Sequence, residues 1–133
     1  MNPVQISLVL AAHDPKALSQ FYAALFSVKI CDGTAKHHRI LDLDNGLRLE
    51  IYRPSQHRPF PAAGRALSIC LKLAAHHTPL IELDQHVSCA LQMGASILEP
   101  ARLEPFGAEC WMNDPEGNAV LLLVPIARSE QSA

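Results

Sequence analysis

The sequence lacks several features that would place it directly in a familiar class. No apolar run approaches the roughly 20 residues that a membrane-spanning helix needs. The start of the chain lacks the charged and then apolar profile of a secretory signal peptide. The net charge is -2, and the Lys and Arg residues form no basic stripe that could follow a phosphate backbone. We therefore predict a cytoplasmic protein with neither a membrane nor a nucleic acid as its partner.

Cysteine pairs at metal-binding or redox spacing are also lacking. The four cysteines, Cys31, Cys70, Cys89 and Cys110, are far apart, and each lies in an apolar stretch. This pattern favours small buried side chains in a reducing compartment over disulfides or a zinc site.

What the sequence does have is the length and composition of one globular domain. Its 133 residues suffice to bury a core without disulfides or a structural metal. Hydrophobic residues make up 49% and charged residues 18% of the chain, which excludes a disordered protein.

Hydrophobic periodicity divides the first half into a strand, a helix and three further strands. Residues 4–11 alternate between polar and apolar as a half-buried strand does. Asp14 and Pro15 are favoured at the start of a helix, and apolar residues then recur at helical spacing up to Phe26. The remaining strands are predicted at residues 28–31, 37–43 and 47–53.

The hairpin between the last two of these strands could adopt two registers. A two-residue Asn-Gly turn would mix polar and apolar side chains on both faces. A three-residue loop with Gly46 in the left-handed conformation pairs Leu43 with Leu47 and leaves one wholly apolar face. We prefer the second register because that face can be buried cleanly. The opposite face then carries His38, Ile40, Asp42, Arg48, Glu50 and Tyr52.

A linker at residues 54–65, rich in proline and glycine, leads into a second half of the same kind. A helix is predicted to start at Thr78-Pro79 and to end before Gly94. Its apolar face comprises Leu80, Leu83, Val87, Ala90 and Leu91. Strands are predicted at residues 67–73, 96–99, 109–113 and 119–124.

The two halves match in detail. Gly46 lies four residues before Glu50, as Gly117 lies four residues before Leu121. Duplication explains this match better than chance. We therefore predict an α+β fold of two βαβββ modules, at about residues 1–53 and 66–125.

In this order of elements the chain resembles the vicinal oxygen chelate superfamily of glyoxalases, bleomycin-resistance proteins and dioxygenases. The matching segments are residues 14–26, with the Phe21-Tyr22 pair, and the turn Asp114-Pro115-Glu116-Gly117-Asn118 before the last strand. The resemblance implies one domain in which a curved mixed sheet forms a cup with the helices outside. It also implies a homodimer.

The resemblance further implies four metal-ligand positions, on the first and last strand of each module. In this sequence they fall on Ser7, Glu50, Ser68 and Leu121. A serine hydroxyl is a poor ligand and Leu121 cannot coordinate a metal at all. We therefore predict that the usual metal site is absent and that the protein has no cofactor. His38, on the cup face beside Glu50, is the best candidate for a different site, whereas His37 is expected to face outward.

The alternation of the strands also predicts which side chains line the cup. These residues are Gln5, Ser7, Val9, His38, Ile40, Asp42, Arg48, Glu50, Tyr52, Ser68, Cys70, Lys72, Glu109, Trp111, Leu121 and Leu123. Such a mixture of aromatic, aliphatic and polar groups is typical of a small-molecule pocket. Among them we expect Ser7, His38, Arg48, Glu50, Tyr52, Ser68, Cys70, Trp111 and Leu121 to bind the ligand.

Three functions fit this lining. The first is a metal-free protein of the bleomycin-resistance type that binds an amphipathic organic molecule. The second is an enzyme in which Glu50 is catalytic, either with a divalent metal in a lyase, isomerase or dioxygenase or as an acid–base catalyst. The third is an interaction module whose cup is filled by its own side chains. Asp42 and Arg48 would be cross-strand neighbours that could simply pair with each other, and Glu50 could pair with Arg48, His38 or Lys72 without a catalytic role.

Overall fold

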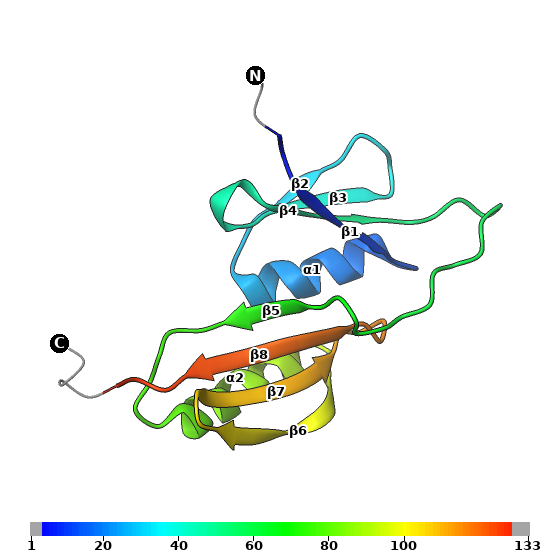
Figure 1. The fold of residues 1–133 in the computed structure, drawn as a ribbon. Coiled ribbons are helices and arrows are strands. Elements are labelled where there is room, and N and C mark those ends of the chain that lie inside the picture. The colour runs from blue at the N-terminus through cyan, green and yellow to red at the C-terminus, as the bar shows by residue number, and fades with distance from the viewer. Residues whose placement is uncertain (1–3, 129–133) are drawn as a thin grey trace. The chain divides into compact units, whose positions relative to one another are not determined.

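The computed structural model describes residues 4–128, which divide into two compact units between residues 62 and 63. We call the unit before this division module 1 and the unit after it module 2. Each has one helix and a four-stranded mixed sheet, in the chain order βαβββ (Figure 1). The predicted α+β fold of two such modules is therefore confirmed.

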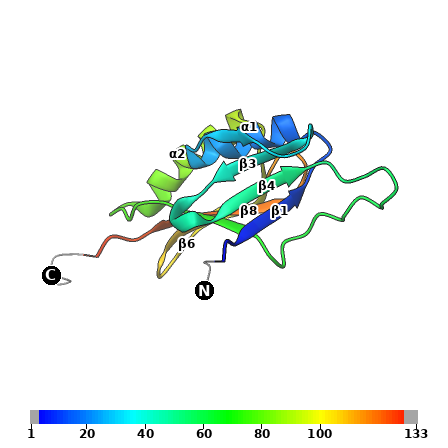
Figure 2. The same ribbon diagram turned by 90° about the horizontal axis from the view of Figure 1, so that it is seen from above.

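Module 1 places its first strand beside its last. Its elements are β1 Ser7–Ala11, α1 Pro15–Phe26, β2 Ile30–Asp32, β3 His38–Asp42 and β4 Arg48–Tyr52. The strand order is β1-β4-β3-β2, and β1 runs parallel to β4 whereas the other neighbours are antiparallel (Figure 2). A short 3-10 turn, Asp44–Gly46, joins β3 to β4.

The helix α1 begins and ends as its sequence predicts. The Asp14 side chain accepts a hydrogen bond of 3.1 Å from the backbone N–H of Ala17, and Pro15 occupies the first turn. The helix packs on β3 and β4. The residues buried between α1 and these strands are Leu18, Phe21, Tyr22, Leu41, Leu49 and Ile51. One face of the sheet is thereby covered.

Module 2 repeats this plan with longer strands. Its elements are β5 Ile69–Lys72, α2 Pro79–Gln92, β6 Ser96–Glu104, β7 Gly107–Asn113 and β8 Ala119–Pro125. The strand order is β5-β8-β7-β6, with β5 parallel to β8. The helix α2 packs on β6, β7 and β8. It buries Leu83, Val87, Ala90, Cys110, Met112, Val120, Leu122 and Val124.

The predicted hairpin register is confirmed. Leu41 lies opposite Leu49, and the backbone N–H of Leu43 donates to the carbonyl of Leu47 at 2.7 Å. Gly46 is left-handed as expected, with a φ of 76°, and so is Asn45, with a φ of 62°. The predicted bounds of α1 are also confirmed.

Other boundaries differ from the prediction. The first strand begins at Ser7 rather than at residue 4, and Ile6 is exposed. The strand predicted at residues 96–99 continues to Glu104. Pro100 within this strand has no N–H to donate, but β6 is an edge strand and its pairing with β7 is irregular there, so the missing donor is tolerated.

The predicted burial of the cysteines is wrong for all but Cys110. Cys31, Cys70 and Cys89 are exposed. Cys31 lies on the edge strand β2, and Cys89 lies on α2 between the buried Val87 and Ala90. Leu91 is likewise 42% exposed, so the buried stripe of α2 ends at Ala90. An apolar sequence neighbourhood therefore did not determine which side of each element faces the core.

Within residues 4–128, no helix combines the length and apolar character needed to cross a bilayer.

The turn between β7 and β8 is organised by one buried carboxylate. The side chain of Asp114 accepts hydrogen bonds from the backbone N–H groups of Glu116 and Asn118, at 2.8 and 3.0 Å. It also accepts one of 2.9 Å from the Asn118 side-chain amide. Asp114 is only 3% exposed, so these bonds compensate for its removal from water. In the turn of module 1 Leu43 occupies the corresponding position, and the neighbouring Asp44 is exposed.

We expect Asp114→Ala to lower the free energy of unfolding by about 2 kcal/mol, because three donors in the turn lose their acceptor. The matched change Asp44→Ala, in the exposed turn of module 1, should cost no more than about 0.5 kcal/mol. Urea unfolding followed by circular dichroism measures both. Equal losses would contradict the structural role assigned to Asp114.

Candidate functional site

A pocket of about 560 Å³ lies on the face of the module 1 sheet that α1 leaves open. Strand alternation explains its position, because Leu41, Leu49 and Ile51 point toward α1 and their neighbours point the other way. The pocket is lined by Val9, Ala35, Lys36, His37, His38, Glu50, Tyr52 and Arg53. Most of the lining is apolar, which suits an organic molecule.

Glu50, on β4, is the acidic group of this pocket. Its Oε1 lies 2.9 Å from Nε2 of His38, on the neighbouring strand β3. The Ser7 hydroxyl of β1 also donates a hydrogen bond to the carboxylate. The two side chains of the His38–Glu50 pair are 18% and 28% exposed, so both are reachable from the pocket. Three adjacent strands thus bring their polar groups together at one point.

The surroundings of His38 determine its protonation pattern. Its Nδ1 accepts a hydrogen bond of 3.2 Å from the backbone N–H of Thr34. A nitrogen that accepts such a bond carries no proton, so the proton of the neutral ring is on Nε2. Nε2 therefore donates to Glu50, and His38 acts as a support for the carboxylate.

Gly33 makes this arrangement possible. Its backbone N–H donates to the carbonyl of His38 at 2.8 Å, which holds the loop against the start of β3. A Cβ atom at position 33 would overlap the His38 imidazole. Only glycine therefore allows the ring to lie where it meets both Thr34 and Glu50.

The hydrogen bonds keep Glu50 ionised. The bond from Ser7 has the largest effect in lowering the pKa of this carboxyl below its ordinary value of 4.5, and partial burial opposes it. The bond from His38, together with the charges of His38 and Arg48, lowers the pKa further. At neutral pH the pocket therefore contains a fixed negative charge.

Several basic residues contribute to the same pocket. Lys36, His37 and Arg53 are all part of its lining. Nη2 of Arg53 lies 3.1 Å from Nδ1 of His37 and donates to it. Desolvation and the charges of Arg53, Lys36 and Arg39, in that order, lower the pKa of His37. His37 is thus neutral at pH 7 and surrounded by positive charge.

All five predicted ligand-binding residues of module 1 lie on this face of the sheet, and His38, Glu50 and Tyr52 line the pocket. Ser7 is hydrogen-bonded to Glu50, and Arg48 pairs with Asp42, where its Nε donates to Oδ1 at 2.8 Å. This is the cross-strand pair that the sequence left open. The pairing of Glu50 with His38, also left open, is present as well.

His37, which was expected to face outward, is exposed and is also among the residues that line the pocket. The expectation came from alternation with His38, and β3 begins at His38, so that His37 lies at the end of the preceding loop. Lys36, Arg53 and Ala35 were also missed as lining residues. Alternation has no force outside a strand, and the clustering of Lys36 and His37 immediately before β3 was the only signal that could have found them.

The predicted residues of module 2 share one face of its sheet, opposite α2. Cys70 of β5 and Trp111 of β7 both lie beside Leu121 of the central strand β8, and Ser68 directly precedes β5. Ser68 donates its hydroxyl to the carbonyl of Arg65 at 3.2 Å. Partial burial raises the pKa of Cys70, so this thiol is not activated as a nucleophile.

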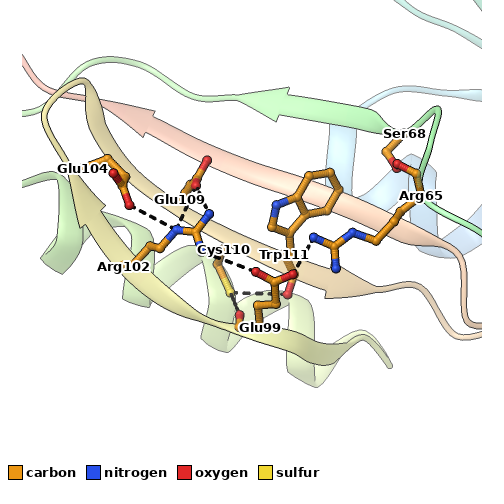
Figure 3. A network of polar contacts seen from close by, with 8 residues as sticks. All are labelled: Arg65, Ser68, Glu99, Arg102, Glu104, Glu109, Cys110 and Trp111. Atoms are coloured by element: carbon orange, nitrogen blue, oxygen red, sulfur yellow. Dashed lines mark hydrogen bonds and ion pairs between the residues drawn. The ribbon is translucent and has the colours of Figure 1, made fainter.

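Ion pairs link several charged side chains of module 2 around Trp111 (Figure 3). Arg102 of β6 donates to Glu109 at 2.7 Å and lies within 3.4 Å of Glu99. Glu99 in turn pairs with Arg65, whose guanidinium carbon lies 4.6 Å from the centroid of the Trp111 ring. Figure 3 shows Arg65 alongside the indole. The Trp111 ring is therefore held by a cation–π contact within a paired network.

The four positions that the resemblance assigns to metal ligands offer two hydroxyls, one carboxylate and one hydrocarbon. The Ser7 hydroxyl already donates to Glu50, and Leu121 has no donor atom. This set does not fit a divalent cation. Across residues 4–128, no three His, Cys, Asp or Glu side chains gather in an arrangement that could hold one.

We expect Gly33→Ala to displace the His38 ring, because the added methyl group would occupy its place. Loss of the two hydrogen bonds should cost about 1–2 kcal/mol of stability and shift the imidazole resonances of His38. Gly64→Ala is the control, since a Cβ there meets open space. Unchanged His38 resonances in Gly33→Ala would contradict the assigned role.

The pKa of Glu50 also predicts a pH dependence of stability. A carboxyl whose folded-state pKa is lowered contributes stability above its ordinary value of 4.5, and this contribution is lost as the pH falls through the lowered pKa. Glu50→Gln should therefore be less stable than the original protein at pH 7, by less than about 1 kcal/mol because water screens the half-exposed group. The difference should vanish in acid. Thermal unfolding across the pH range measures it, and a difference that grows in acid would refute it.

Comparisons with known proteins agree with this fold. A family model described as a glyoxalase-like domain matches residues 7–123. No curated protein matches the chain. Among solved structures, a glyoxalase/bleomycin resistance protein from Albidiferax ferrireducens T118 is 18% identical with a TM-score of 0.65, covering 90% of this chain and 96% of that one.

Two further solved structures are similar over comparable lengths. A glyoxalase/bleomycin resistance protein/dioxygenase family enzyme from Burkholderia phytofirmans PsJN is 15% identical with a TM-score of 0.69, covering 90% of this chain and 97% of its own. A lactoylglutathione lyase from Agrobacterium tumefaciens is 18% identical with a TM-score of 0.57, and the match covers 93% of this chain and 95% of that one. At these identities the likeness shows the fold alone. Because the family model spans nearly the whole chain, the protein belongs to the glyoxalase-like domain family of the vicinal oxygen chelate superfamily.

Proposed function

We propose that this protein binds a small amphipathic organic molecule in the module 1 pocket, without the metal ion usual in its superfamily. The observation that carries the proposal is the ionised Glu50 carboxylate, held by Ser7 and His38 in a pocket of about 560 Å³ with mostly apolar walls. Such a volume suits a small organic molecule.

Glu50 is the group that would orient the ligand. Its carboxylate is held on the sheet by two donors from neighbouring strands, so it needs no reorganisation on binding. An ionised carboxylate accepts hydrogen bonds and attracts positive charge. The ligand is therefore expected to present an N–H, O–H or cationic group to Glu50 and its apolar part to Val9 and Tyr52.

The same hydrogen bonds favour binding over acid–base catalysis. A general base is most effective when its pKa lies near the working pH. Donors from Ser7 and His38 move the pKa of Glu50 in the opposite direction, which makes the carboxylate a weaker base. His38 has its Nδ1 occupied by Thr34 and its Nε2 proton directed at Glu50, so neither nitrogen is available to a substrate.

The absence of a metal rests on the donor chemistry of Ser7, Ser68 and Leu121. A metal-dependent lyase, isomerase or dioxygenase remains the alternative, since a lactoylglutathione lyase and an oxidase are among the similar structures. We further propose that the protein is a cytoplasmic homodimer, as the resemblance implies. The exposed Leu103 and Phe106 of module 2 support an interface. A ligand-binding role of Ser68, Cys70, Trp111 and Leu121 stays a prediction.

The test is a fragment screen by NMR, with and without the chelator EDTA. Fragments that pair an ammonium or N–H donor with an apolar group should shift the resonances of Val9 and Tyr52. EDTA should have no effect. Glu50→Gln should weaken their binding about tenfold, because a charge-assisted hydrogen bond is lost. Glu104→Gln is the matched control, since Glu104 is paired with Arg102 and similarly exposed but lies in module 2.

Metal analysis of the purified protein decides between the two functions. Stoichiometric zinc, nickel, manganese or iron that is lost on Glu50→Ala would overturn the proposal and support the metal-dependent enzyme. Fragments that bind equally to the original protein and to Glu50→Gln would show that Glu50 does not orient the ligand.

A further inference from the structure

The pocket of module 1 is lined by basic residues that take no part in the His38–Glu50 pair. Lys36 and His37 lie in the loop before β3, and Arg53 directly follows β4. All three line the pocket. Because β3 and β4 are antiparallel neighbours in the sheet, the segment before β3 meets the segment after β4.

The backbone positions this basic group. The N–H of Arg53 donates to the carbonyl of His37 at 3.2 Å, which extends the pairing of β3 and β4 by one step. The Arg53 guanidinium then donates to Nδ1 of His37. Since Nδ1 accepts, the proton of the neutral His37 ring is on Nε2, where it is a hydrogen-bond donor. All three side chains therefore offer donors.

No carboxylate of the described part of the chain forms an ion pair with Lys36 or Arg53. Four other arginines of the described residues are paired: Arg39 with Asp32, Arg48 with Asp42, Arg65 with Glu99, and Arg102 with Glu109. Desolvation, and after it the charges of Arg53, Lys36 and the paired Arg39, lower the pKa of His37. Such a concentration of donors and charge attracts an anion.

We propose that Lys36, His37 and Arg53 bind an anionic oxygen group, a carboxylate or a phosphate, of the molecule that occupies the module 1 pocket. This inference rests on the proposed function and specifies its ligand. The guanidinium of Arg53 matches two oxygens of such a group, and Lys36 adds a second charge. The apolar body of the ligand lies against Val9, Ala35 and Tyr52, and its donor group faces Glu50. The ligand is therefore an organic acid or phosphate ester with a separate N–H or O–H group.

Benzoate and benzamide test this inference, because they share an aromatic ring and differ in charge. Titrations followed by NMR should show both probes at Val9 and Tyr52, with benzoate bound about fivefold more tightly at low salt. Sodium chloride should weaken benzoate binding and leave benzamide binding unchanged. Phenyl phosphate in a third titration distinguishes the two anions, since a site built for phosphate binds it more tightly than benzoate.

Lys36→Gln and Arg53→Gln should each weaken benzoate binding about threefold to tenfold and leave benzamide binding unaltered. Lys29→Gln is the matched control, because it removes one positive charge from an exposed position of module 1 outside the pocket. It should bind both probes as the original protein does. Thermal midpoints show whether each variant is folded.

The outcomes separate the two proposals. If benzoate and benzamide bind equally and the two lining variants change neither, the pocket binds organic molecules and the anion inference is wrong. If no probe shifts the resonances of Val9 and Tyr52 at millimolar concentrations, both the proposed function and this inference are wrong. An equal loss in Lys29→Gln would assign the effect to net charge and overturn the assignment to the pocket.

Discussion

The burial of one face of each sheet beneath its own helix is the constraint on which the rest of this structure depends. Side chains in a strand alternate, so a face that packs against a helix commits every second residue to the core. In module 1 this commitment is made by Leu41, Leu49 and Ile51. The intervening residues must then lie on the open face, whatever their chemistry. The pocket is a direct consequence, because the strand residues that line it are those whose side chains point away from the core.

On this open face the polar groups are organised by local hydrogen bonds. Thr34 sets the tautomer of His38, His38 and Ser7 hold Glu50, and Gly33 leaves room for the ring. A half-buried carboxylate with such donors remains charged and stationary. These are the properties of a group that orients a ligand, and they differ from those of a proton acceptor.

The open faces of the two modules differ in how their charged side chains are paired. In module 2 Arg65, Glu99, Arg102 and Glu109 neutralise one another around Trp111, so the charges of that network are already satisfied. In module 1 the acid is held by hydrogen bonds from Ser7 and His38, and the bases Lys36 and Arg53 have no acidic partner in the part of the chain described. Duplication thus produced two similar scaffolds, and the distribution of charged residues has since given them distinct electrostatics. An unpaired charge at a pocket attracts a ligand of the opposite sign, whereas a paired network does not.

The sequence by itself determined the two βαβββ modules, the bounds of α1, the hairpin register and the residues that share a face in each strand. These follow from periodicity and from the chemistry of caps and turns, which act over a few residues and are therefore readable locally. It also identified His38, Glu50 and Tyr52 as neighbours. Only the tertiary structure decided that His37 and Arg53 line the pocket together, and that Cys31, Cys70 and Cys89 are exposed. The reason is physical: loops follow no period, and the burial of an element depends on what packs against it, so these positions are set by contacts between segments that are far apart in the chain.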